Sequence, residues 1–236
     1  MDKEKKVQNI FNSISTDYDL MNNIISFNQH NLWRNRTMKE MFVKDDHDIL
    51  DVCCGTGDWT IQLAEEAPEA EVVGLDFSEK MLEVAAEKTS WHSNIELIQG
   101  NAMALPFNDG SFDYVTIGFG LRNLPDYGSA VEEFYRVLKP GGTLVILETS
   151  TPENQLISRG FDFYFGKIMP TLGGIIADSA KEYEWLYEST SAFLSKDALK
   201  FMMKKSGFIN LKVIPHTFGT AATHIGYKPL GQVGRH

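Results

Sequence analysis

Residues 49–60, with the sequence ILDVCCGTGDWT, constrain the fold of this chain more than any other stretch. A short apolar run leads into two glycines, and a helix-favouring pattern follows directly after them. Gly55 and Gly57 lack a Cβ, so the backbone there can adopt positive φ angles or approach a ligand closely. Thr60 stands where the dinucleotide fingerprint has its third glycine, which disfavours a two-phosphate cofactor. The stretch predicts a strand, a nucleotide-type turn and a helix, although a purely structural turn stays open at this point.

Strands and helices continue to alternate after this turn. Further strands are expected at residues 71–75 and 95–99 and in the runs FDYVTIG and TLVILET, and helices in EKMLEVAAEKT and SAVEEFYRVLKPGG. Ser78 is the expected N-cap of the first of these two helices. Alternation of this kind predicts an α/β fold, in which helices cover both faces of a parallel sheet and ligands bind at the carboxyl ends of the strands.

The other segments are expected to complete one domain over residues 1–236, because no linker divides the chain. Residues 1–45 should form a cover of short helices, which begins with an amphipathic helix. Residues 46–150 would be the core that binds the nucleotide-type ligand. Residues 152–190 form an aromatic, glycine-containing insertion that favours helices, and residues 191–236 favour a closing helix and an antiparallel hairpin.

Charge and cysteine content narrow the classes of function. The formal net charge of -10 argues against nucleic acid as a partner, since that binding rests on a positive surface. The two cysteines, Cys53 and Cys54, are adjacent and build neither a disulfide framework nor a CxxC metal or redox site. We expect a cytoplasmic protein, because the sequence has no apolar signal segment at its start and no run of ~20 apolar residues. Peripheral contact with the inner face of a membrane stays open.

Polar residues follow the first three predicted strands at positions that suit an adenosyl ligand. The turn with Gly55 follows the first strand, Asp76 ends the second, and Asn101 and Ala102 follow the third. Asp76 could accept hydrogen bonds from ribose hydroxyls, while Asn101 and the Ala102 amide bind the adenine edge. Asp76 could instead only cap the helix that follows it. With this constellation the sequence is similar to the S-adenosylmethionine-dependent methyltransferases.

Longer motifs make the resemblance more specific. The strings FNSISTDYDLMN, DVCCGTGDWT, GLDFSEKML, FDYVTIGFGLRN, LKPGG and HIGYKP resemble the menaquinone and ubiquinone biosynthesis C-methyltransferase family over nearly the whole chain. The resemblance implies a Rossmann-like class I methyltransferase fold with a seven-stranded, mostly parallel sheet, an antiparallel C-terminal hairpin and helices on both faces. It also implies S-adenosylmethionine as the cofactor, S-adenosylhomocysteine as its product, and no metal.

The same resemblance implies roles for individual residues. The expected cofactor-binding residues are Thr56, Asp76, Asn101 and Ala102, together with the glycines Gly55 and Gly57 of the turn. The expected catalytic residues, which would lie together by the substrate ring, are Arg122, Asn123 and Tyr18. A cationic Arg122 that stabilises a phenolate is chemically simpler than Arg122 as a base, because guanidinium keeps its proton throughout the usable pH range.

The acceptor implied by the resemblance is a lipophilic quinol. Members of the ubiquinone branch carry Ser where this chain has Gly118, which favours C-methylation of demethylmenaquinol to menaquinol, the last methylation in menaquinone biosynthesis. A ubiquinone precursor or another phenolic small molecule is the alternative acceptor. A nicotinamide-dependent dehydrogenase would need the full glycine fingerprint. A protein that binds the cofactor without catalysis would be expected to have lost Tyr18, Arg122 and Asn123.

Structural interpretations of several residues also stay open. Asp51 is expected to hold the turn, or to reach the amine of the cofactor through solvent, rather than to act in the chemistry. His30 could serve as a base, but a lone histidine more often packs or caps. Arg122 could be a surface ion-pair partner and Tyr18 could simply pack. The aromatic residues 161–177 could be core, a subunit contact in a homodimer, or an apolar entrance that touches a membrane.

Overall fold

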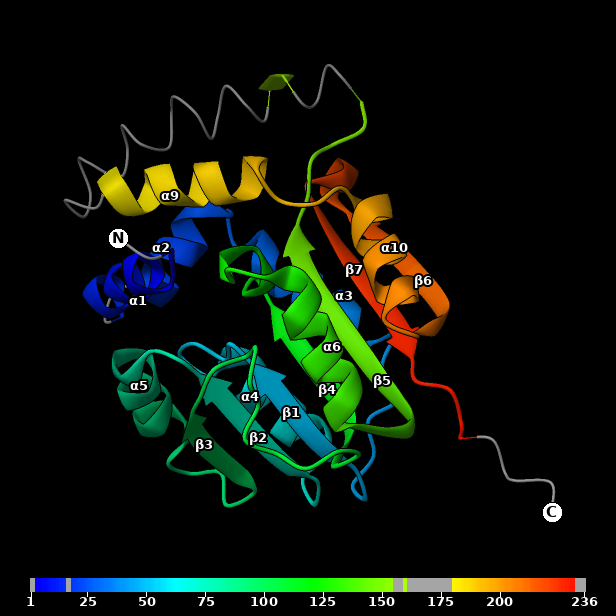
Figure 1. The fold of residues 1–236 in the computed structure, drawn as a ribbon. Helices are drawn as coiled ribbons and strands as arrows, with labels where there is room; N and C mark the ends of the chain where they lie inside the picture. Colours follow the sequence, from blue (N-terminus) through cyan, green and yellow to red (C-terminus); the bar gives the residue numbers. More distant parts are fainter. Residues whose placement is uncertain (1–2, 16–17, 155–158, 161–179, 232–236) are drawn as a thin grey trace, which may run out of the picture.

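The computed structural model describes residues 3–15, 18–154, 159–160 and 180–231 of the chain (Figure 1). The aromatic residues 161–177 lie outside the described residues, so their role in the core, in a homodimer or at a membrane stays a prediction. The last part of the predicted insertion is described, and it forms helix α9, Ala180–Ser191.

One sheet of seven strands organises the fold, in the order β3-β2-β1-β4-β5-β7-β6. Neighbouring strands among the first five run parallel, whereas β7 pairs antiparallel with both β5 and β6. The strands are β1 Asp48–Val52, β2 Glu71–Asp76, β3 Ile95–Gln99, β4 Phe112–Gly118, β5 Leu138–Thr149, β6 Ile209–His216 and β7 Ala221–Tyr227. The predicted sheet, with its antiparallel C-terminal pair, is confirmed. Strands β2 and β3 are added on one side of β1, and β4 and β5 on the other, so the strand order switches sides between β1 and β4. Open α/β sheets bind ligands at such a switch point.

Helices precede, connect and follow these strands. They are α1 Lys3–Ile14, α2 Tyr18–Ile25, α3 Gln29–Met38, α4 Asp58–Glu66, α5 Glu79–Thr89, α6 Tyr127–Val137 and α10 Lys196–Lys205, with short 3-10 turns at Leu121–Asn123 and Thr217–Gly219. The side chain of Ser78 accepts a hydrogen bond from the Met81 amide, so Ser78 is the N-cap of α5 as predicted. Asp126 and Ser195 cap α6 and α10 in the same way.

Strand β5 begins earlier than the run TLVILET suggests. Leu138 pairs with Phe112, and the register then shifts so that Thr143 pairs with Tyr114. The Pro-Gly-Gly sequence occupies the irregular stretch between these pairs, where Gly141 has a φ of 86°. The turn residues therefore interrupt a strand here instead of preceding it.

Both faces of the sheet are buried, and β1 shows how. Leu50 and Val52 point into a core cluster that includes side chains of α6 and α10, whereas Ile49 points into a second cluster with side chains of α3 and α4. All three side chains are fully buried. Successive residues of a strand point to opposite faces, so an apolar strand of this kind is expected in a sheet covered on both sides.

The N-terminal helices lie over the carboxyl ends of the parallel strands. Figure 1 shows α1 and α2 beyond the arrowheads of the parallel strands, together with α9. Helix α1 also packs against α5. The N-terminal helices thus lie at the carboxyl ends of the strands, where a ligand is expected.

Candidate active site

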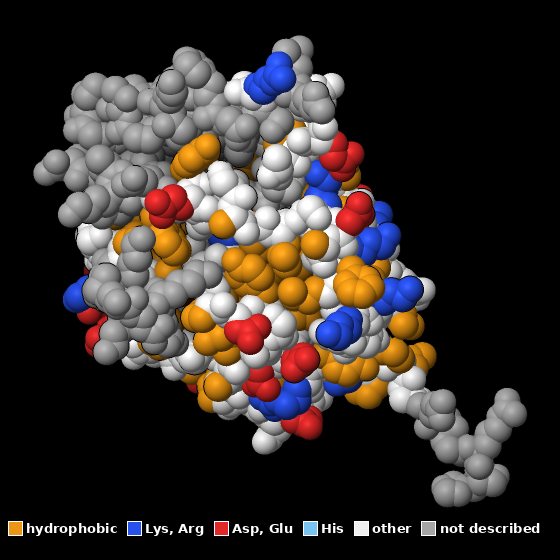
Figure 2. Space-filling view, turned by 45° about the horizontal axis from the view of Figure 1, so that its top comes forward, with side chains coloured by type: hydrophobic (Ala, Val, Ile, Leu, Met, Phe, Trp, Pro, Cys, Tyr) orange, Lys and Arg blue, Asp and Glu red, His pale blue; other side chains and the backbone are white. Residues whose placement is uncertain are grey.

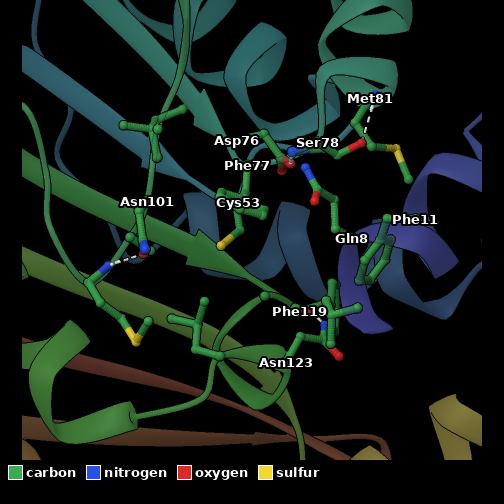
Figure 3. A pocket seen from close by; sticks show the side chains of 18 of the residues that line it. Gln8, Phe11, Cys53, Asp76, Phe77, Ser78, Met81, Asn101, Phe119 and Asn123 are labelled. Carbon is green, nitrogen blue, oxygen red and sulfur yellow. Dashed lines mark hydrogen bonds between the residues drawn. The ribbon is translucent and has the colours of Figure 1, made fainter. Parts of the chain in front are cut away.

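A cleft opens at the carboxyl ends of β1, β2 and β4, below the N-terminal helices (Figure 3). It contains about 770 Å³ of space, counting its open mouth. Four of the predicted cofactor-binding residues line it, namely Gly55, Asp76, Asn101 and Ala102. Since they follow three different strands, the parallel sheet brings together what the sequence separates.

Asp76 fixes the floor of this cleft. Its Oδ2 accepts a hydrogen bond of 2.9 Å from the Gly55 amide, and its Oδ1 accepts one of 2.8 Å from the Ser78 amide. Burial raises the pKa of the Asp76 carboxyl. The residue therefore supports both the glycine turn and the start of α5 while it lines the cleft, so a capping role and a ligand-binding role are compatible.

The glycine turn uses its residues in three different ways. Gly55, with a φ of 57°, lines the cleft, and a Cβ built on it would lie 3.8 Å from the Tyr18 ring. The side chain of Thr56 is buried and donates a hydrogen bond of 2.6 Å to Asp19 Oδ1, beside a second cavity. Gly57, with a φ of 84°, lets α4 approach α5, because a Cβ there would lie 3.3 Å from that of Ala85. The structure thus places Gly55 against the cleft and Gly57 against a helix.

The other walls of the cleft come from the loop after β3, from α1 and from the segment after β4. Asn101 Oδ1 accepts a hydrogen bond of 2.9 Å from the Met103 amide, which holds the loop after β3 in place. Gln8 extends from α1 toward Asp76, the Phe11 ring lies beside it, and Phe119 and Asn123 form the opposite side (Figure 3). Sequence reasoning missed both residues of α1. Phe11, as an apolar residue of an amphipathic helix, carries no mark that distinguishes a ligand cleft from a core, and Gln8, as a polar residue, is expected on the solvent face of such a helix.

Arg122 lies behind the cleft in a buried ion pair. Its Nη1 is 2.5 Å from Glu148 Oε1 and donates a second hydrogen bond, of 2.6 Å, to the Phe119 carbonyl oxygen. The backbone amide of Arg122 also donates to Glu148 Oε2, at 3.2 Å. The alternative of a surface ion pair is wrong, because Arg122 is 7% exposed and Glu148 is 1% exposed. The acidic residue that directly follows the apolar residues LVIL in the run TLVILET was the available signal for Glu148.

The three predicted catalytic residues meet at a third cavity beside the cleft. Tyr18, Arg122 and Asn123 all line it, and Tyr18 and Asn123 line the cleft as well. Asn123 donates to the Phe119 carbonyl oxygen at 3.2 Å and accepts a hydrogen bond of 3.1 Å from Trp185 Nε1 of α9. Burial raises the pKa of the Tyr18 hydroxyl, so Tyr18 stays protonated at neutral pH. The three residues therefore connect the cleft to α9.

The second cavity is more polar and lies on the far side of the glycine turn. Asp51 is fully buried there and accepts hydrogen bonds of 2.7 Å from both Thr60 Oγ1 and Thr116 Oγ1. Asp51 thus ties β1 to α4 and β4, as expected for a residue that holds the turn. Burial is the main reason why the pKa of His30, which lines the same cavity, is lowered to about 4, so His30 is neutral at physiological pH.

Among the described residues, no group of three or more His, Cys, Asp and Glu side chains is arranged to hold a metal ion. None of the helices in those ranges is long and apolar enough to cross a membrane.

Comparison with known proteins extends over nearly the whole chain. The demethylmenaquinone methyltransferase of Staphylococcus carnosus is 54% identical over 227 residues, which are 96% of this chain and 94% of the relative. The protein of the same name from Staphylococcus aureus is 54% identical over 226 residues, which are 95% and 94% of the two chains.

Solved structures share the fold at lower identity. A SAM-dependent methyltransferase from Thermotoga maritima superposes with a TM-score of 0.69 at 19% identity, over 94% of this chain and 99% of that one. One from Aquifex aeolicus gives a TM-score of 0.60 at 18% identity, over 82% and 88% of the two chains. A sequence profile of the ubiE/COQ5 methyltransferases matches residues 1–228. This chain belongs to the ubiE/COQ5 methyltransferase family.

Proposed function

We propose that this protein transfers a methyl group from S-adenosylmethionine to a ring carbon of demethylmenaquinol and so forms menaquinol. The observation that carries the proposal is the 54% identity, over nearly full length, to relatives named demethylmenaquinone methyltransferase. The class I methyltransferase fold supports it, and so does the placement of the predicted ligand-binding residues around one cleft.

The polar groups of the cleft suit an adenosyl cofactor. Asp76 offers carboxylate oxygens for ribose hydroxyls, Asn101 and the Ala102 amide offer groups for an adenine edge, and Gly55 leaves space for close approach to the backbone. When bound, S-adenosylmethionine supplies an electrophilic methyl group on a sulfonium. The residues proposed to hold it are Gly55, Asp76, Asn101 and Ala102, with Thr56 and Gly57 fixing the turn.

Methylation at a ring carbon requires phenolate character in the acceptor, correct positioning, and later removal of the ring proton. We propose that Arg122, which Glu148 holds in place, stabilises the phenolate. Asn123 and Tyr18 would orient the ring or a water molecule. Arg122 would act through its charge and not as a base, because guanidinium does not lose its proton in this pH range.

Two features support a lipophilic quinol as acceptor. The cleft is lined by Phe11, Met81, Met103, Phe119 and Leu124 among other apolar side chains. Figure 2 shows that apolar side chains also gather near the middle of the face that comes forward from the top of Figure 1, with charged side chains mainly around them. Location in the cytoplasm, and contact with the membrane that holds such a quinol, stay predictions from the sequence.

The surroundings of Gly118 support the menaquinone branch. A Cβ on Gly118 would lie 2.8 Å from Trp59 Cε3, so Ser at this position would force the indole ring to move. The indole is itself held, since Trp59 Nε1 donates a hydrogen bond of 3.1 Å to Met38 Sδ. The pocket of this chain is therefore built for glycine at the position that distinguishes the two branches.

The test is a direct comparison of acceptors. The purified chain is incubated in detergent with S-adenosylmethionine and either demethylmenaquinol or the demethylated ubiquinol precursor, and product mass is measured. We expect a gain of one methyl group with demethylmenaquinol and a much slower reaction with the ubiquinol precursor. Methylation of the ubiquinol precursor alone would overturn the choice of acceptor, and methylation of neither would overturn the proposed function.

A further inference from the structure

The third cavity, beside the cleft, lies among helices outside the nucleotide-type core. Its walls come from α1, α2, the 3-10 turn Leu121–Asn123 and α9. Figure 1 shows α1, α2 and α9 beyond the carboxyl ends of the parallel strands. Phe11, Tyr18 and Asn123 line both this cavity and the cleft, so they mark the junction where the two spaces meet. A ligand bound at this junction can therefore extend from one space into the other.

Away from the junction the walls of the third cavity are largely apolar. Ile10 and Ile14 lie one turn apart on the same side of α1, while Met21 comes from α2 and Trp185 from α9. The side chains of Ile14 and Met21 are buried. The indole of Trp185 is held by the hydrogen bond from its Nε1 to Asn123 Oδ1, at 3.1 Å. The cavity thus offers aliphatic and aromatic surface to a ligand, which favours an apolar group.

The polar residues of this cavity are Tyr18, Asn22, Arg122, Asn123 and Ser189. Tyr18 and Asn123 belong to the junction with the cleft. Arg122 lines the third cavity but not the cleft, so the charge proposed to stabilise the phenolate borders the third cavity. An acceptor ring whose oxygen lies near Arg122 would therefore sit at the junction, with the third cavity next to it.

The chemistry of the transfer limits where a substituent on the ring can go. A ring carbon attacks the methyl group through the face of the ring, in line with the bond from sulfur to methyl. A tail on the neighbouring ring carbon leaves in the plane of the ring, and so to the side of that line. An apolar tail is disfavoured in the second cavity, where it would meet Arg34 and Asp51, whereas Ile10, Ile14 and Met21 would surround it in the third.

We propose that the third cavity binds the first part of the isoprenoid tail of the quinol, while the ring lies at the junction with the cleft. The inference rests on the proposed function and adds a tail site to it. It gives the N-terminal cover a role in acceptor selection, because Ile10, Ile14 and Met21 lie on α1 and α2. These residues would distinguish a prenylated quinol from one without a tail.

The test isolates the tail with two small quinols that need no detergent. One is 1,4-dihydroxynaphthalene, which has no tail, and the other is its 2-prenyl derivative, which carries one isoprene unit. Both are kept reduced under argon, and their affinities are measured by calorimetry with S-adenosylhomocysteine present. Burial of an apolar group of this size contributes about 10- to 100-fold in affinity, so the unaltered protein should prefer the prenylated quinol by about that factor.

Two variants narrow the cavity from different walls. Met21→Trp fills it from α2, and Ile10→Phe fills it from α1 and provides a second measurement if Met21→Trp does not fold. Each should reduce the preference for the prenylated quinol about 10-fold. Leu20→Trp is the matched control, because Leu20 is the neighbouring residue of α2 but is 57% exposed, and it should keep the full preference.

The outcomes separate this inference from the proposed function. A prenylated quinol that binds the unaltered protein no more tightly than the quinol without a tail would overturn the inference. So would a preference that stays the same in the unaltered protein, Met21→Trp and Ile10→Phe. Failure of the unaltered protein to methylate demethylmenaquinol in the assay described above would instead overturn the proposed function.

Discussion

Arg122 Nη1 lies 2.5 Å from Glu148 Oε1, and the two side chains are almost wholly buried. The pair joins the turn after β4 to the end of β5. The Glu148 carboxylate also accepts hydrogen bonds from the backbone amides of Arg122 and Thr149. Arg122 is therefore held by the fold before any ligand binds. Glu148 lines none of the three cavities described above, so it acts as a positioning residue for Arg122.

Removal of Glu148 should destabilise the protein strongly. Glu148→Ala leaves a buried guanidinium without its carboxylate, which costs about 3 to 5 kcal/mol in the free energy of unfolding. Urea unfolding followed by circular dichroism measures this change. Glu83→Ala is the matched control, because it breaks an exposed ion pair with Lys80 and should leave the unfolding midpoint unchanged. A Glu148→Ala protein as stable as the unaltered one would contradict the buried ion pair.

Arg122 should affect turnover more than cofactor binding. The double variant Arg122→Ala/Glu148→Ala removes both charges, so no buried charge is left alone. Its kcat should fall about 100-fold, because a charge that stabilises the phenolate is lost. Affinity for S-adenosylhomocysteine, measured by calorimetry, should change little. A loss of cofactor affinity as large as the loss of kcat would show that Arg122 organises the cofactor site instead.

Asp51 should make stability depend on pH. Its pKa is raised by burial from 3.8 to about 6, so the folded protein holds this proton more tightly than the unfolded chain does. Its contribution is full below pH about 4 and declines as pH rises to about 6, by about 3 kcal/mol in all. The free energy of unfolding, compared between the unaltered protein and Asp51→Asn at several pH values, should show this relative decline. A difference that does not vary between pH 4 and 6 would contradict it.

Lys88 should hold the N-terminal cover closed over the cleft. Its Nζ lies 2.7 Å from Asp19 Oδ2 on α2 and also pairs with Asp58 on α4. Lys88→Met should raise the KM for S-adenosylmethionine about 3- to 10-fold, and hydrogen exchange in residues 18–25 should become faster. Lys80→Met is the control, since Lys80 is an exposed lysine of the same helix. Unchanged exchange in α2 would show that the cover is held by other contacts.

Gly118→Ser should disturb the pocket through Trp59. The added Cβ would lie 2.8 Å from the indole, and overpacking of this kind costs about 1 to 3 kcal/mol. We expect a lower melting temperature and a lower kcat/KM for demethylmenaquinol. Gly160→Ser provides the control, because a Cβ on Gly160 meets no described atom within 4 Å. If Gly118→Ser kept the full kcat/KM for demethylmenaquinol, Gly118 would not select the acceptor.

The elements of the fold could be predicted because local signals agree with one another. Apolar runs of strand length, the Ser78 cap and the glycine turn each specify structure within a few residues. Parallel strands end at one edge, so the positions of Gly55, Asp76 and Asn101 after successive strands were enough to bring them to one cleft. This part of the site follows from chain order alone.

The charged parts of the site could not be predicted in the same way. Arg122 and Glu148 are 26 residues apart and meet because β4 and β5 pair side by side. Arg34 and Asp51 line one cavity only because the cover folds back over the glycine turn. The hydrogen bond from Thr56 Oγ1 to Asp19 Oδ1 of that cover forms for the same reason. Such contacts depend on the approach of distant segments, which no short pattern in the sequence records.

The position of the transferred methyl group tests the central claim most directly. The protein is incubated with demethylmenaquinol and S-adenosylmethionine carrying a 13C-labelled methyl group, and the product is examined by NMR. The account predicts that the labelled methyl is bonded to the vacant ring carbon of the naphthoquinol. A label on a phenolic oxygen, or no label in the quinol at all, would contradict it.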